Sequence, residues 1–126
     1  MSCVIRKDLS VTQGIAYPDP VDPQTYTWAT GPDALTATNM DLTGATGIHA
    51  VRGAFGGTPL ISHTQATGLV LGAALAGHIK PTFTGAEIAA LPIGWYVHDI
   101  TITPALGPYA GLPVLFMVGN FYVGAI

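Results

Sequence analysis

Glycine and proline interrupt this chain so often that few segments are long enough to form a regular helix. The 126 residues include 16 glycines and 10 prolines, and a glycine inside a helix costs about 1 kcal/mol relative to alanine. Between these breaks lie short runs of β-branched, aromatic and aliphatic residues. This pattern is typical of short strands joined by tight turns.

The clearest strand pattern runs from Trp95 to Thr103, because alternation with a period of two places Tyr96, Ile100 and Ile102 on one face, with His98 among them. Similar, weaker patterns predict further strands elsewhere in the chain. With this segment included, the expected strands are 8–17, 25–29, 48–55, 60–63, 68–75, 78–83, 95–103 and 114–126.

One segment predicts a helix. Thr84 and Glu87 have the spacing of a capping box, and Pro92 ends the segment after one or two turns. Gly56 and Gly57 predict a hairpin turn between two strands. We therefore expect an all-β, Ig-like antiparallel β-sandwich of about seven or eight short strands with one short helical turn, formed as a single domain by residues 1–126.

The few charges exclude one class of partner. Lys and Arg number 4, Asp and Glu number 7, and the net charge is -3. Four basic residues cannot form the positive surface that phosphate contacts require, so we expect no nucleic-acid partner.

Membrane attachment is not expected either. The N-terminal segment MSCVIRKDLS has no apolar run of the signal-peptide type. Uncharged stretches such as 68–77 and 112–119 are shorter than the roughly 20 residues that span a bilayer. We expect a soluble, unanchored protein that is made in a cytoplasm.

The same scarcity of charge predicts an assembly of subunits. Charged residues form 9% of the chain, against about 25% in an ordinary domain. Much of the surface must therefore either consist of neutral Thr, Gly, Ala and Pro or be covered by other subunits, and we favour coverage by other subunits. The segment from Val114 to Val118 is apolar at odd and even positions alike, which indicates that both faces of the strand are covered. The residues expected at a homo-oligomeric interface are Leu115, Met117, Phe121, Val123 and Trp95.

Residues that carry chemistry form no recognisable set. The four histidines have no zinc-site spacing, and neighbouring His98 and Asp99 fall on opposite faces of a strand, so they cannot act as a pair. Cys3 is the single cysteine, and Asp19 with Asp22 supplies too few oxygens for calcium. We therefore expect no catalytic residue, no cofactor and no metal.

Aromatic residues leave a different ligand class open. Trp28, Trp95 and Tyr96 are candidates for a platform on which a sugar ring stacks, although aromatic residues on strands are more often part of a core. A carbohydrate-binding module is thus one alternative function.

Four segments in order resemble small tail and baseplate proteins of tailed bacteriophages, and are similar to the N-terminal domain of the baseplate upper protein. They read RKDLSVTQG, DLTGATGIHAVRG, IAALPIGWYVHDITI and LFMVGNFYVG. The positions that match the family's motifs are Asp41, Leu42, Thr43, Gly44, Arg52, Gly94, Tyr96, Asp99, Gly119, Phe121 and Val123.

The chain also departs from that family. Its middle segment is shorter and poorer in charge than is usual there. Larger members carry a receptor-binding or coiled-coil extension after this domain, whereas this sequence ends at Ile126. The resemblance therefore implies a docking module without a receptor-binding part.

The resemblance implies a non-enzymatic structural protein of the virion, acting as an oligomeric adaptor in the baseplate or tail. Its partners would be other virion proteins and further copies of itself. A capsid decoration protein that stabilises the head shell is the alternative, because it also needs a small, neutral, oligomeric sandwich.

Overall fold

A computed structural model describes most of the chain. No helix among the described residues is long and apolar enough to cross a membrane. The described residues are 5–14, 16–17, 26–27, 29–30, 38–39, 41–65, 67–71, 78–106 and 110–125.

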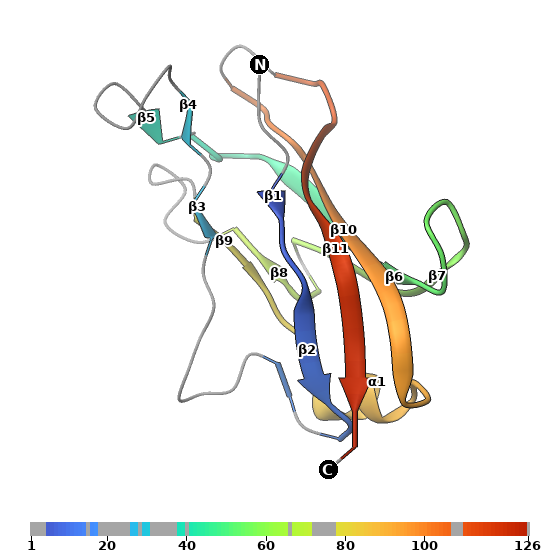
Figure 1. Ribbon diagram of the computed structural model, residues 1–126. Helices are drawn as coiled ribbons and strands as arrows, with labels where there is room; N and C mark the ends of the chain where they lie inside the picture. The colour runs from blue at the N-terminus through green and yellow to red at the C-terminus, as the bar shows by residue number, and fades with distance from the viewer. Residues whose placement is uncertain are drawn as a thin grey trace.

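A six-stranded sheet forms the larger layer, and its two longest strands lie side by side at its centre (Figure 1). Strands β10 and β11 are antiparallel, β6 pairs with the other edge of β10, and β7 pairs with β6 through a hairpin around Gly56. The strands of this sheet are β1 (Ile5–Arg6), β2 (Leu9–Thr12), β6 (Thr46–Arg52), β7 (Pro59–Thr64), β10 (Gly94–Thr103) and β11 (Val114–Gly124).

The pairing of the N-terminal strands differs from the antiparallel expectation. Both β1 and β2 pair with β11 in parallel, one after the other along the same strand. Parallel neighbours need a long connection, and here the chain passes through the second layer before it returns to the main sheet. The main sheet is therefore mixed.

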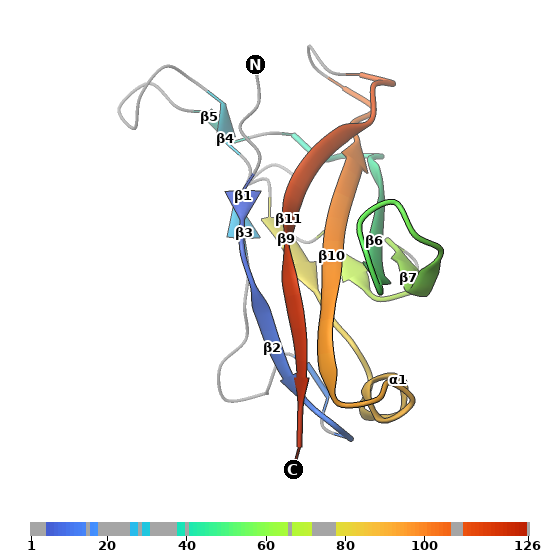
Figure 2. The same ribbon diagram turned by 45° about the vertical axis from the view of Figure 1, so that its right-hand side comes forward.

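The second layer consists of short strands on one side of the main sheet, as Figure 2 shows. One small sheet has the order β3-β9-β8, and β4 pairs with β5 separately. These strands are β3 (Tyr26–Thr27), β4 (Ala29–Thr30), β5 (Thr38–Asn39), β8 (Leu69–Val70) and β9 (His78–Pro81).

Apolar side chains from both layers meet between them. Leu69 of β8 and Ile79 of β9 pack with Ile100, Ile102 and Met117 of the main sheet, and all five are fully buried. This shared core makes the fold a sandwich-like all-β structure, which confirms the predicted fold class.

A short helix, α1 (Gly85–Ala89), closes one end of the sandwich (Figure 2). Thr84 accepts a hydrogen bond from the Glu87 amide, and the Glu87 carboxylate accepts one from the Thr84 amide, so the predicted capping box is present. Ile88 and Leu91 place their side chains in a second cluster of the core with Phe83. The helix thus covers apolar residues that the short strands leave open.

Candidate interaction face and buried histidine cluster

The main sheet has two different faces. On β10, residues of even number point toward the core, as buried His98, Ile100 and Ile102 show, and residues of odd number point outward. Strand pairing carries the same alternation to the neighbouring strands. The outward side is named the outer face, and its exposed large apolar residues include Ile48, Trp95 and Leu115.

Of the five residues expected at an interface, two are exposed and three are buried in the structure. Trp95 is 69% exposed and Leu115 is 41% exposed, and both lie on the outer face. Met117, Phe121 and Val123 are 0% exposed within a single chain. These three residues are therefore part of the protein's own core, and their assignment to a contact surface is corrected.

A β-bulge explains why the sequence pattern was misleading here. Met117 pairs with Ile100 and Leu115 pairs with Thr101, so Phe116 is an extra residue in β11. Neighbouring residues of a regular strand point to opposite faces, but because of the bulge the side chains of both Phe116 and Met117 lie in the same core cluster. Apolar residues at both parities here reflect a change of register and do not require a second covering surface.

One end of the outer face carries an aromatic pair. Trp95 and Tyr122 are cross-strand partners, and their ring centroids lie 4.7 Å apart with the planes tilted by 48°. Tyr96, the neighbour of Trp95, points inward and packs against the core, while its hydroxyl donates to the Pro92 carbonyl. Trp28, the other candidate for a sugar platform, lies outside the described residues.

The centre of the outer face carries an ion pair. Arg52 Nη1 contacts Asp99 Oδ2, and Arg52 Nε donates to the Gly57 carbonyl at 2.9 Å. Both residues belong to the motifs on which the phage resemblance rests. Because the two charges oppose each other, the pair contributes no net charge to the outer face.

The inner face contains three buried histidines that sequence spacing did not bring together. His63 of β7 is opposite His49 of β6, and His98 of β10 is a neighbour of His49 across the next pair of strands. The rings of His49 and His63 both lie about 5 Å from the Phe83 ring. As predicted, His98 and Asp99 lie on opposite faces, His98 in the core and Asp99 with Arg52.

Two of these histidines form a hydrogen-bonded chain with a single consistent arrangement of protons. The Lys7 carbonyl lies 2.7 Å from His98 Nε2, and a carbonyl only accepts, so His98 Nε2 donates. A neutral imidazole carries one proton, so His98 Nδ1 must then accept a hydrogen bond. It lies 3.0 Å from His49 Nε2, which therefore donates. His49 Nδ1 is buried and has no hydrogen-bond partner.

Burial keeps this pair neutral. Desolvation lowers the pKa of His49 well below 6.5, and the nearby His98 and His63 lower it further. Desolvation also lowers the pKa of His98, although the Lys7 carbonyl and the carboxylates of Asp99 and Asp8 act in the opposite direction.

The third histidine connects the main sheet to the helix. His63 Nε2 contacts Glu87 Oε2, and the His63 ring packs against Gly68, where a Cβ would lie 2.9 Å from His63 Cγ. Glu87 therefore caps α1 with one oxygen and holds His63 with the other.

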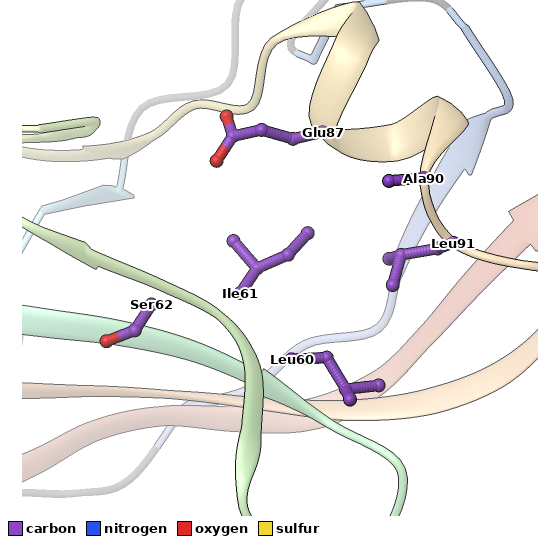
Figure 3. A pocket seen from close by; sticks show the side chains of 6 residues that line it. All are labelled: Leu60, Ile61, Ser62, Glu87, Ala90 and Leu91. Atoms are coloured by element: carbon purple, nitrogen blue, oxygen red, sulfur yellow. The ribbon is translucent and has the colours of Figure 1, made fainter.

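A pocket of about 460 Å³ lies between β7 and α1 (Figure 3). Its walls are mainly apolar, and both oxygens of its single carboxylate are already engaged by Thr84 and His63. The described residues contain no group of three or more side chains placed to hold a metal ion. The pocket lining is Leu60, Ile61, Ser62, Glu87, Ala90 and Leu91.

Three other residues considered for chemistry are not placed by the structure. Cys3 and the pair Asp19 and Asp22 lie outside the described residues. Comparison of the sequence with models of known protein families gives no match, and comparison with curated proteins gives none.

Proposed function

We propose that this chain is a non-enzymatic structural protein of a tailed-phage virion, which assembles with copies of itself as an adaptor in the baseplate or tail. The observation that carries the proposal is the outer face of the main sheet, where exposed apolar side chains surround a self-neutralised ion pair. Permanent interfaces combine apolar contact with few unpaired charges. The sequence resemblance to baseplate proteins supplies the virion context.

Leu115 is the residue of choice to test the self-assembly. It lies on the outer face near the start of the central strand β11, where it pairs with Thr101, and Thr101 pairs in turn with Ile48. Because Leu115 is 41% exposed in the single chain, an aspartate there stays solvated in the monomer. Buried against another subunit, the same carboxylate would lose its water without a partner.

The experiment compares L115D with L112D by sedimentation equilibrium. Leu112 lies just before β11 and is 57% exposed, so L112D introduces the same charge outside the sheet. We expect the natural chain and L112D to form the same oligomer and L115D to be monomeric with unchanged circular dichroism. An L115D chain that still assembles fully would contradict an interface at this face.

The place in the virion needs a second experiment. Gold-labelled antibodies against the chain, applied to purified phage particles, should bind at the tail tip. Label spread over the head would instead identify a capsid decoration protein. Absence of label on both intact and disrupted particles would refute the virion assignment.

The exposed aromatic pair favours a second candidate, a carbohydrate-binding module. Trp95 is 69% exposed and stands beside Tyr122, and such rings stack against the apolar faces of sugars. Titration with glycans should then shift tryptophan fluorescence, and W95A should abolish the shift while W28A retains it. A fluorescence signal that no glycan changes would exclude this function.

A further inference from the structure

The connection between β1 and β2 runs along the edge of β11 and comes closest to it at a glycine. The Lys7 amide donates to the Val118 carbonyl at 3.0 Å, and Asp8 Oδ1 accepts from the Asn120 amide at 2.9 Å. Between these two contacts lies Gly119, where a Cβ would come within 2.6 Å of the Lys7 carbonyl carbon. The absent side chain is therefore what lets the N-terminal segment approach so closely.

The same close approach brings the Lys7 carbonyl to the histidine chain. Gly119 is the cross-strand partner of His98, so the carbonyl that passes over Gly119 reaches His98 Nε2. His98 is in turn fixed by His49. The N-terminal segment is thus attached to the core of the sheet through two consecutive imidazole rings.

An additional proton has no acceptable position in this chain. A proton on His98 Nδ1 would face the N–H of His49 Nε2 at the present separation of 3.0 Å. Moving the His49 proton to Nδ1 would relieve that conflict, but it would leave a buried donor without an acceptor. The first arrangement opposes two N–H groups, and the second leaves an unpaired N–H and a positive charge buried, so either one destabilises the closed state.

The charged groups around the pair do not remove this conflict. His63 faces His49 from β7 and adds no negative charge, while Glu87 on α1 is engaged by His63. Asp8 lies on the connection itself and is bonded to the Asn120 amide. Asp99 lies on the opposite face of β10 and is paired with Arg52.

We propose that His49 and His98 form an acid-sensitive latch: while neutral they hold the Lys7 carbonyl, and on protonation they release β1 and β2 from β11. Release lets both rings reach water and take up protons. It also uncovers one edge of β11 and the side chains of Leu9 and Val11, which are buried in the closed state. Acidification would thereby expose a strand edge with which other strands can pair.

Amide hydrogen exchange of the full chain tests the latch. Between the ordinary histidine pKa of 6.5 and the lower pKa values of the closed state, the opening constant of residues 5–12 should rise about tenfold per pH unit for each proton taken up. This rise is measured between pH 7.5 and 5.0 after correction for the intrinsic exchange rate. Amides of β6 and β10 should keep their protection over the same range.

Glutamine substitutions separate the latch from other sources of pH dependence. Glutamine retains an N–H donor but does not titrate, so the double variant H49Q/H98Q should remove the pH dependence of residues 5–12. H78Q is the matched control, because His78 lies on β9 outside the cluster, and it should behave like the natural chain. An unchanged slope in H49Q/H98Q, or a slope removed by H63Q alone, would overturn the proposal.

A measurement on the natural chain keeps the proposal testable if the double variant does not fold. Two-dimensional ¹H–¹⁵N spectra of the imidazole nitrogens at pH 7.5 should show His49 and His98 neutral, each with its proton on Nε2. A proton on Nδ1 in either ring would overturn the latch. Loss of protection in β1, β2, β6 and β10 together on acidification would overturn it as well.

Discussion

Replacing Gly119 by alanine tests the close approach of the N-terminal segment to β11. The added Cβ would lie 2.6 Å from the Lys7 carbonyl carbon and closer still to its oxygen. These are backbone atoms, which cannot rotate away as the end of a side chain can. The connection between β1 and β2 must therefore move off the sheet.

The hydrogen bonds around Gly119 set the size of the effect. Displacement breaks the bond from His98 Nε2 to the Lys7 carbonyl and leaves a buried donor unpaired, which costs about 1–3 kcal/mol. It also weakens the Lys7–Val118 and Asn120–Asp8 bonds, at about 0.5–1.5 kcal/mol each. We expect G119A to lose about 2–6 kcal/mol of the free energy of unfolding, measured by urea denaturation.

Gly53 supplies the matched control for this substitution. A Cβ at Gly53 meets no atom within 4 Å, and Gly53 is not among the glycines with positive φ. G53A should therefore change the free energy of unfolding by less than about 1 kcal/mol, with any change toward greater stability. If G119A were as stable as G53A, the close approach of Lys7 to β11 would be refuted.

Three further predictions concern the helix and the core. T84A removes the cap of α1 and should cost about 1 kcal/mol in urea denaturation, whereas T84S should retain most of the stability. Burial raises the pKa of Glu87, but bonds from Thr84 and the contact with His63 outweigh it and hold the pKa below 4.5. The stabilisation by Glu87 is thus complete above pH 4.5 and is lost as the pH falls further. In E87Q the free energy of unfolding should therefore fall less steeply below pH 4.5 than it does in the natural chain. An equal fall in both chains would contradict this prediction. G47A would place a Cβ 2.7–2.9 Å from the ends of the Leu69 and Ile102 side chains. It should cost about 1–3 kcal/mol of the free energy of unfolding and lower the calorimetric melting temperature. A melting temperature equal to that of the natural chain would refute the prediction.

Local patterns were sufficient to predict most individual elements. The strand expected at Trp95 to Thr103 is β10, and the capping box of Thr84 and Glu87 begins α1 where expected. These features depend on residues within a few positions of one another, so periodicity and capping chemistry reveal them. The bulge at Phe116 is different, because it is defined by the register against β10 and leaves no local signature in the sequence.

Features that depend on strand order were beyond the reach of the sequence. His49, His63 and His98 become neighbours only because β7, β6 and β10 are adjacent, and nothing in their spacing indicates that order. The contact of His98 with Lys7 further requires parallel pairing of the first strands with β11. A sharper signal was Gly119, a glycine inside a strand, since such a residue often marks the close approach of another backbone.

The position of β11 has a consequence for how the protein acquires its structure during synthesis. This strand follows every other described element in the chain, yet it lies between β1 and β2 on one side and β10 on the other. The bond between Asn120 and Asp8 joins residues 112 positions apart, and such distant contacts form slowly. Strands β1 and β2 therefore have no partner in the sheet until β11 has been synthesised, and the sheet cannot be completed before then.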